Sequence, residues 1–284
     1  AVIFVLVFNY APMFGIVIAF QDYKILEGVS GSEWVGFKAF RDMFFLANTS
    51  TYRLLRNTLY ISIIRILTNF PLILLFALLI REIKNRTCRS AIQTVAYIPY
   101  FISWVAVSGI AYNLFSADEG LINKMLVAFG GKPVSWYTEE EPWWWILALS
   151  SLWKGMGWST LIYMSAMGSI DGELYDACLI DGGGRWQQAM VVTLPGIANV
   201  IAMQVLMDAG SVLSANADQI LAMTNGSASL GNTDVIGSSM IANITGGGSF
   251  AQATALGLVQ GVVGLIMVFI VNSVVKKTEN EGIL

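Results

Sequence analysis

The sequence contains no histidine, and only 12% of its 284 residues are charged. Soluble domains carry about 25% charged residues. The 56% hydrophobic content and the mean hydropathy of +0.65 therefore point to a single membrane domain. Without histidine, and with only Cys88 and Cys178 as thiols, the usual imidazole or thiolate metal site is excluded. We expect the two cysteines to be unpaired thiols in a reducing compartment.

Catalytic patterns are also missing. There is no GxxxxGK[ST] phosphate loop, so we do not expect this chain to hydrolyse ATP. Without histidine, no Ser-His or Cys-His pair can activate a nucleophile. The apolar run at residue 1 lacks a charged leader and a small-residue cleavage site, so we expect no signal peptide there and further residues upstream. A membrane-embedded enzyme is disfavoured.

Long apolar stretches are present. A helix that crosses a bilayer needs about 20 mostly apolar residues. Six stretches qualify and are predicted to span the membrane: Ala1–Phe20, Asn57–Ile80, Ala91–Phe115, Trp143–Gly168, Pro195–Met223 and Phe250–Val275. The fifth is the weakest because polar residues interrupt it. It qualifies because such residues can face other helices or a water-filled path.

The distribution of lysine and arginine predicts the orientation. Arg81, Lys84, Arg86 and Arg89 lie within nine residues between the second and third stretches, and Lys276 and Lys277 follow the sixth. Short loops rich in these residues stay in the cytoplasm. Six spans place both clusters on that side. The longer segments 21–56, 116–142 and 224–249 then lie outside.

Residues 171–195 form a polar, glycine-containing segment between the fourth and fifth spans. Asp171 and Glu173 open a predicted short helix, where the helix dipole favours acids. Gly182-Gly183-Gly184 ends it, and a second short helix leads to Pro195 in the first turn of the next span. This cytoplasmic helix–turn–helix is either a plain connector or a docking element for a cytoplasmic partner.

One motif in this segment resembles the EAA motif of binding-protein-dependent ABC importer permeases. The family pattern is Glu-Ala-Ala, three residues, Gly, nine residues, Ile-x-Leu-Pro. The chain has Asp176-Ala177-Cys178, then Gly182, then Val192-Thr193-Leu194-Pro195 at the same spacings. Asp176 is one methylene shorter than the family's glutamate. The surrounding residues, Glu173–Tyr175 and Ile180–Gln187, are typical of the sugar-importing branch, and Gln93–Val105 resembles permeases of alginate importers.

The resemblance implies an all-α membrane protein of the bacterial inner membrane, with six transmembrane helices in the type I ABC importer permease fold. It implies a first helix and outer segment (1–52), a permease core (53–277) with a coupling-helix hairpin (171–195), and a cytoplasmic tail (278–284). The implied partners are a second homologous permease, a cytoplasmic ATPase dimer that binds ATP and Mg, and an extracytoplasmic solute-binding protein. No cofactor is expected in this chain. The implied ATPase-coupling residues are Glu173, Asp176, Ala177, Cys178, Gly182, Arg185, Leu194 and Pro195.

Charged residues also lie inside the predicted spans. Arg65, Lys154 and Asp208 would each cost at least about 2.5 kcal/mol facing lipid at mid-depth, so we expect them to face the bundle interior or an interface. One interpretation is snorkelling or structural pairing. The other is that they line a substrate path with Trp153 and attract an anionic sugar such as a uronate.

Two classes of function remain. The first is the membrane subunit of an ATP-driven importer of oligo- or polysaccharide, with alginate or another uronate polymer as the specific choice. The second is a secondary transporter or channel that is not coupled to ATP. That class would favour inverted-repeat halves and broken helices, and it has no need of a docking hairpin. Vanadate-sensitive uptake distinguishes the two.

Overall fold

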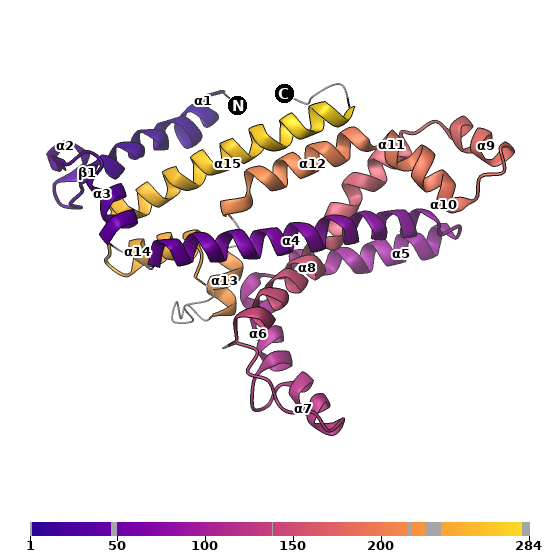
Figure 1. Cartoon of the computed structure of the whole chain (residues 1–284), viewed down its shortest axis with the longest axis horizontal. Coiled ribbons are helices and arrows are strands. Elements are labelled where there is room, and N and C mark those ends of the chain that lie inside the picture. The colour runs from indigo at the N-terminus through magenta and orange to yellow at the C-terminus, as the bar shows by residue number, and fades with distance from the viewer. Residues whose placement is uncertain (1, 47–49, 138, 215–216, 225–233, 280–284) are drawn as a thin grey trace.

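The computed structural model describes residues 2–46, 50–137, 139–214, 217–224 and 234–279. Helices dominate these residues (Figure 1). The three longest are α4 (Ser50–Arg81), α8 (Glu140–Gly168) and α15 (Phe250–Glu279). The N-terminal helix is continuous through α1 (Val2–Val5), a π segment (Leu6–Tyr10) and a 3₁₀ segment (Ala11–Phe20).

The described residues contain fewer straight spans than the sequence predicted. Three helical segments are long and apolar enough to cross a membrane: Val2–Phe20, Thr51–Arg81 and Phe250–Lys276. Two bent helix pairs raise the number to at most five, so the predicted count of six is not confirmed. The fourth predicted span lies in α8, which is long enough. Its mean hydropathy is lowered by tryptophans, serines, glycines and Lys154.

The third predicted span is not one straight helix. Helix α5 (Arg86–Tyr97) continues as a 3₁₀ turn (Ile98–Phe101), and α6 (Trp104–Phe115) then leaves at an angle of 99°. Ile102 is extended, with φ −76° and ψ 132°. The Ser103 hydroxyl accepts a hydrogen bond from the Ala106 N–H at 3.2 Å, which caps the new helix. A proline in the 3₁₀ turn and a serine cap after it explain the break.

The fifth predicted span is also broken. Its first residues belong to α11 (Leu194–Gly196), and α12 (Ala198–Gly210) follows after a bend of 65°. A 3₁₀ turn (Val212–Ser214) and α13 (Ala217–Met223) complete the stretch, in which residues 215–216 lie outside the described residues. Of the polar residues that weaken this span in the sequence, Ser211 and Ser214 lie between α12 and α13, whereas Asp208 and Asp218 lie within those helices.

The chain places two groups of connecting segments at opposite ends of the long helices (Figure 1). The turn between α4 and α5 lies at one end with α9 (Gly172–Ile180) and α10 (Arg185–Gln188). At the other end lie α2 (Gly28–Gly31), α3 (Lys38–Arg41), a π turn (Asp42–Leu46) and α14 (Ile236–Thr245). Strands β1 (Gln21–Asp22) and β2 (Glu33–Trp34) pair there as a two-residue antiparallel ribbon. It is a small departure from the predicted all-α class.

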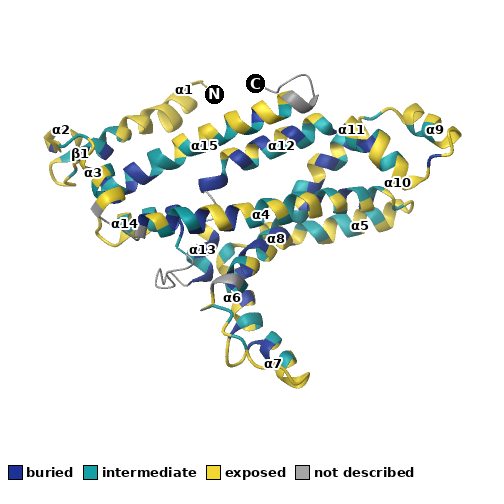
Figure 2. Cartoon of the chain, viewed as in Figure 1, coloured by how far each residue is buried: buried dark blue, intermediate teal, exposed yellow. Residues whose placement is uncertain are grey.

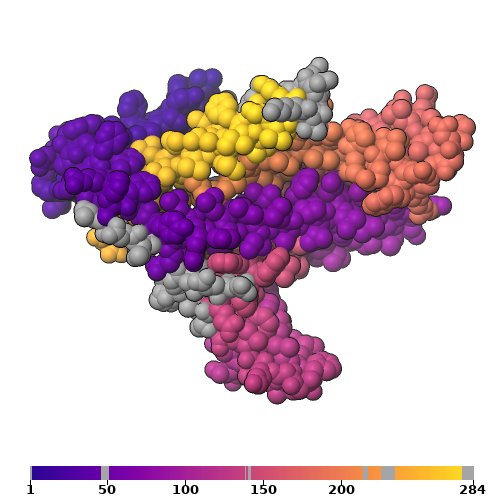
Figure 3. All heavy atoms as spheres, viewed as in Figure 1, coloured from indigo at the N-terminus to yellow at the C-terminus, as the bar shows by residue number. Residues whose placement is uncertain are grey.

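Burial is concentrated where helices cross, and the remaining helix surfaces are exposed (Figure 2). Only 17% of the apolar window of α4 and 6% of that of the first helix are buried within the chain. Large exposed apolar surfaces belong to a protein whose surroundings are lipid or other subunits. The segment of α6 and α7 (Leu121–Ala128) projects from the body as a separate lobe (Figure 3).

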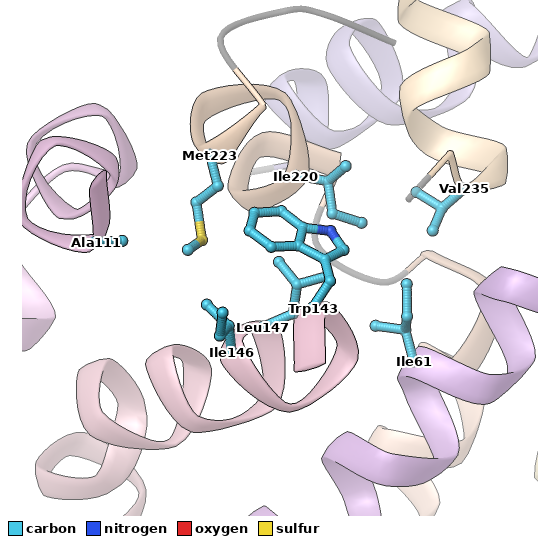
Figure 4. Packing of buried hydrophobic residues seen from close by; sticks show 8 residues of the cluster. All are labelled: Ile61, Ala111, Trp143, Ile146, Leu147, Ile220, Met223 and Val235. Carbon is cyan, nitrogen blue, oxygen red and sulfur yellow. The ribbon is translucent and has the colours of Figure 1, made fainter. Parts of the chain in front are cut away.

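Trp143, at the start of α8, is the centre of one core (Figure 4). It is fully buried among residues of α4, α6, α8 and α13. Next to it, the buried Gln219 donates its amide to the Leu147 carbonyl at 2.8 Å and to the Ser150 hydroxyl at 2.9 Å. A second core joins α4, α8 and the start of α12, and includes Ile73, Tyr163 and Ile197. Helix α8 therefore organises the bundle that positions the sites described next.

Candidate functional site

The segment between α8 and α12 is the helix–turn–helix that the sequence predicted. The Asp171 carboxylate accepts a hydrogen bond from the Glu173 N–H at 3.0 Å and caps α9. Gly182, at φ +81°, closes the helix in the left-handed conformation. The Gly183 N–H then donates to the Cys178 carbonyl at 2.8 Å, which satisfies one of the last carbonyls of α9. Of the three glycines, Gly182 alone has a positive φ.

The second arm begins at α10 and continues through a π turn (Ala189–Thr193) into α11. The Gln187 side chain accepts a hydrogen bond from the Gly184 N–H at 3.0 Å, so this arm too is capped at its first turn. Pro195 lies in the first turn of α11, as the sequence predicted. Each arm of the hairpin is therefore capped by residues of its own first turn.

Arg81 anchors the hairpin to the last turn of α4. Its guanidinium donates to the Tyr175 hydroxyl at 2.6 Å and to the Thr193 hydroxyl at 2.8 Å, one on each arm. It also lies over the Tyr175 ring, 4.2 Å from the ring centroid. Thr193 is only 2% exposed. In the sequence, Arg81 stands out only as one of the charges that predict the orientation, and no pattern indicates Tyr175 and Thr193 as its partners.

The predicted coupling residues occupy different faces of the hairpin. Cys178 and Pro195 line a groove of about 490 Å³ between the two arms. Arg185 lies on the opposite side, where its Nε is 3.4 Å from a Glu82 carboxylate oxygen. Six of the eight are exposed, and Cys178 and Leu194 are half-buried; the exposed residues are Glu173, Asp176, Ala177, Gly182, Arg185 and Pro195.

The tip of the hairpin presents apolar side chains to its surroundings. Leu179, Ile180 and Trp186 are 62%, 85% and 70% exposed. Asp176 lies on α9 with Leu179 and Ile180, and it makes no ion pair within the described part of the chain. An exposed apolar patch beside a free carboxylate is a surface suited to a protein partner.

Inside the bundle, α4, α8 and α12 enclose a polar cavity of about 220 Å³. Arg65 and Asp208, both predicted for the substrate path, line it from α4 and α12. The other polar lining groups are hydroxyls and amides, contributed by Asn69, Ser151, Ser159, Tyr163, Gln204 and Ser211. Hydroxyls, amides and one opposite-charge pair are groups that hydrogen-bond to a polyhydroxylated ligand.

Lys154 lies outside this cavity. Its ammonium donates to the carbonyls of Tyr100 and Ile102, both at 2.6 Å, and lies 3.4 Å from the Pro99 carbonyl. These carbonyls belong to the bend between α5 and α6, where the helical hydrogen-bond pattern is interrupted. Lys154 therefore supplies donors that the broken backbone lacks.

The aromatic residues of α8 also have separate environments. Trp153 lines an apolar cavity of about 390 Å³ between α6 and α8. Trp158 stacks on Tyr100, with 4.7 Å between ring centroids. Tyr163, by contrast, is 2% exposed and lines the polar cavity. Trp153 and Lys154 are thus not brought together with Arg65 and Asp208.

At the opposite end of α4, the fully buried Asn57 donates to the Asp234 carbonyl at 3.1 Å. Burial raises the pKa of the Asp234 carboxyl, and the nearby Arg53 guanidinium opposes that shift. In the loop before α8, burial raises the pKa of Tyr137 to about 12.

The described residues contain no group of three histidine, cysteine, aspartate or glutamate side chains able to hold a metal ion.

Comparisons with known proteins place this geometry in context. The model of the family "Binding-protein-dependent transport system inner membrane component" matches residues 44–279. Protein LplB of Bacillus subtilis is 35% identical over 281 residues, which cover 99% of this chain and 87% of the relative. The polygalacturonan/rhamnogalacturonan transport system permease protein YteP of the same organism is 37% identical over 284 residues, with the same coverage.

Two solved structures are also similar. One is a bacterial ABC transporter involved in the import of the acidic polysaccharide alginate, with a TM-score of 0.87 and 31% identity over 98% of this chain and 93% of that one. The other is a bacterial alginate ABC transporter in complex with an alginate pentasaccharide-bound periplasmic protein, again with a TM-score of 0.87. This second match covers 99% of this chain and 93% of the matched chain in that structure, at 31% identity.

Proposed function

Because this chain belongs to the binding-protein-dependent transport system inner membrane components and is a sugar ABC importer permease, we propose that it carries a uronate polymer, such as alginate, by alternating access. The family assignment itself accounts for the apolar helices and for a multi-pass protein of the inner membrane. The observation that carries the proposal is the combination of an anchored cytoplasmic hairpin with a polar cavity that contains Arg65.

Two similar proteins support the choice of substrate. The solved transporter imports alginate, described as an acidic polysaccharide, and YteP is named for polygalacturonan, a polymer of a uronic acid. An anionic sugar needs a cation along its path. Arg65 offers one, and its neighbour Asp208 reduces the cost of holding that cation inside the bundle when no substrate is present.

We propose that energy enters through the hairpin. A cytoplasmic ATPase dimer, which binds ATP and Mg, grips residues 172–188 of this chain and the corresponding hairpin of a second permease subunit. Leu179, Ile180 and Trp186 provide apolar contact area, and Asp176 provides a carboxylate for a basic residue of the ATPase. A solute-binding protein delivers the saccharide to the outer face. No cofactor is held by this chain itself.

The hairpin proposal is tested with Asp176→Ala and Gly182→Ala in the complete transporter. Asp176→Ala removes the proposed contact and should leave the fold of the hairpin unchanged, because the carboxylate makes no ion pair within the described residues. Gly182→Ala strains the turn, at a cost of about 1–2 kcal/mol for a left-handed alanine. Gly184→Ala is the matched control, since φ is −73° there and a Cβ would meet open space.

We expect both test variants to lower uptake and co-purification of the ATPase, and Gly184→Ala to retain both. Unchanged uptake and assembly for Asp176→Ala and Gly182→Ala would count against the docking role. Vanadate-sensitive uptake by the purified complex separates the importer from a secondary transporter or channel, in which vanadate has no effect.

The substrate proposal is tested with Arg65→Gln and Arg65→Lys in reconstituted uptake assays. Acidic and neutral oligosaccharides of equal length are compared. We expect Arg65→Gln to lower uptake of the uronate oligomer at least about tenfold, since a charge-assisted hydrogen bond contributes about 1.5–3 kcal/mol. Arg65→Lys should restore part of that uptake. If Arg65→Gln slows both substrates equally, or if wild type prefers the neutral oligomer, the uronate assignment is wrong.

A further inference from the structure

A further cavity lies between the α4–α5 turn and the hairpin, at the end of the molecule that the charge distribution places in the cytoplasm. Its volume is about 550 Å³, within the range of small-molecule sites. One acid and five cations line it: Glu82, and Arg81, Lys84, Arg86, Arg89 and Arg185. The cavity is separate from the groove between the hairpin arms and from the polar cavity in the bundle.

Two of the five cations have partners within the chain. Arg81 donates to Tyr175 and Thr193, and Arg185 lies 3.4 Å from Glu82. Lys84, Arg86 and Arg89 make no ion pair within the described residues. The cavity therefore keeps an excess of positive charge that the described residues do not neutralise.

The N-terminus of α5 adds to that excess. The helix has 12 residues and begins at Arg86, with no acid in its first turn. The Asn85 side chain caps it by accepting hydrogen bonds from the N–H groups of Thr87 and Cys88, at 2.9 and 3.1 Å. Helix N-termini carry partial positive charge and favour anions. The positive charges of Arg86 and Arg89 are therefore repelled by the positive end of the helix dipole. A bound anion would offset this repulsion.

We propose that this cavity binds the phosphate headgroup of an acidic phospholipid from the cytoplasmic leaflet. Helix α4 carries its apolar span as far as Arg81, so the cavity opens where the span ends. Leu75 and Leu79 are 43% and 58% exposed on the last turns of α4 and provide apolar surface near the same depth for acyl chains. A basic pocket at the cytoplasmic end of membrane helices has the chemistry that recognises such headgroups. The hairpin forms one wall, so the lipid contacts the proposed ATPase-docking element directly.

The test measures lipid binding to the full chain, purified in detergent with the subunits that accompany it. Phosphatidylglycerol and phosphatidylcholine are titrated separately and bound lipid is counted by native mass spectrometry. We compare wild type with Arg86→Gln/Arg89→Gln. The control, Lys124→Gln/Lys132→Gln, removes the same charge from exposed side chains of the lobe at α7. Arg86→Lys/Arg89→Lys keeps the charge in the cavity.

Wild type should bind phosphatidylglycerol in preference to phosphatidylcholine. Each membrane-proximal cation contributes about fivefold, so Arg86→Gln/Arg89→Gln should lose about 25-fold in affinity for phosphatidylglycerol. The control double variant and the lysine double variant should keep most of it. Glycerol phosphate should compete only at far higher concentration than the lipid, because it lacks acyl chains.

Three results would overturn the assignment. Equal binding of the two lipids by wild type removes the need for a headgroup site. Inorganic phosphate that binds as tightly as the lipid makes the ligand a soluble anion. Loss of the accompanying ATPase in Arg86→Gln/Arg89→Gln, with lipid selectivity unchanged, assigns the cavity to an acidic protein surface. None of these results depends on which saccharide is transported, so the inference and the proposed substrate fail independently.

Discussion

The bond network of Arg81 predicts that one substitution on α4 loosens the whole hairpin. Arg81→Met removes the hydrogen bonds to Tyr175 and Thr193 and the contact with the Tyr175 ring, and keeps an unbranched side chain. The hydroxyls of Tyr175 and Thr193 remain 3.1 Å apart and can still bond to each other. The substitution therefore disconnects the hairpin from α4 without disconnecting its arms.

The expected magnitude follows from these contacts. Hydrogen bonds to a charged group contribute about 1.5–3 kcal/mol each when buried. Because Arg81 is half-exposed, each hydrogen bond should contribute less than the lower end of that range. We take about 2 kcal/mol for the two hydrogen bonds together. The ring contact adds about 0.5 kcal/mol. Together, about 2.5 kcal/mol corresponds to a roughly 60-fold increase in the population in which the hairpin is detached.

Glu82→Gln is the matched control because it lies on the neighbouring position and also contacts the hairpin. Its partner Arg185 is 65% exposed and the Glu82 side chain is 46% exposed. An exposed ion pair contributes about 0–1 kcal/mol, so Glu82→Gln should change detachment less than about fivefold.

The measurement is amide hydrogen exchange of residues 172–196 in the complete transporter, with the amides of α15 as an internal reference. Arg81→Met should accelerate exchange in both arms and leave α15 unchanged, and uptake per ATP hydrolysed should fall. If exchange in the hairpin is the same as in wild type, or if Glu82→Gln accelerates it equally, the anchoring role assigned to Arg81 is wrong.

Two further predictions concern packing and pH. Gly157→Ala places a Cβ in overlap with the Ala96 carbonyl of α5 and should cost about 1–3 kcal/mol, whereas Gly168→Ala meets open space and should change stability by less than about 0.5 kcal/mol. Thermal unfolding in detergent measures both, and equal shifts in Tm would contradict the close crossing of α5 and α8. Burial raises the pKa of Asp234 in the folded state above its usual value of 3.8. Between these two pKa values the folded state binds more protons than the unfolded state, so stability falls as pH rises through this range. Asp234→Asn should remove this pH dependence and raise Tm near neutral pH; a Tm profile unchanged from wild type would refute it.

Features determined by near neighbours in the chain could be predicted from the sequence. The Asp171 cap, the turn at Gly182 and the position of Pro195 all follow from residues within one or two helical turns. Helix α4 was predicted for the same reason, because a long uninterrupted apolar run has few alternative structures. The break after Pro99 was not predicted, because residues 91–115 were assigned to one span, although Pro99 and the Ser103 cap are local signals for the end of one helix and the start of the next.

Features that depend on distant segments could not. Arg81 lies 94 and 112 residues before Tyr175 and Thr193, and nothing near it in the sequence indicates a tyrosine or threonine partner. Lys154 was recognised as a cation in need of a partner. Its partners are backbone carbonyls exposed by a bend elsewhere, and a sequence pattern carries no record of them. For the same reason, apolarity alone could not separate Arg65, which lines the polar cavity, from Lys154, which does not.

The bend between α5 and α6 also has a consequence for how the protein is made. The carbonyls of Tyr100 and Ile102 are synthesised about 50 residues before Lys154, and they accept hydrogen bonds from its ammonium in the folded chain. Until α8 has been translated, the bent segment lacks the Lys154 donor for those carbonyls. We therefore expect α5 and α6 to take their final angle only when α8 arrives, because the bent backbone would otherwise leave these carbonyls without that donor. Nascent chains truncated before residue 154 should consequently cross-link differently at α6 from chains that extend beyond α8.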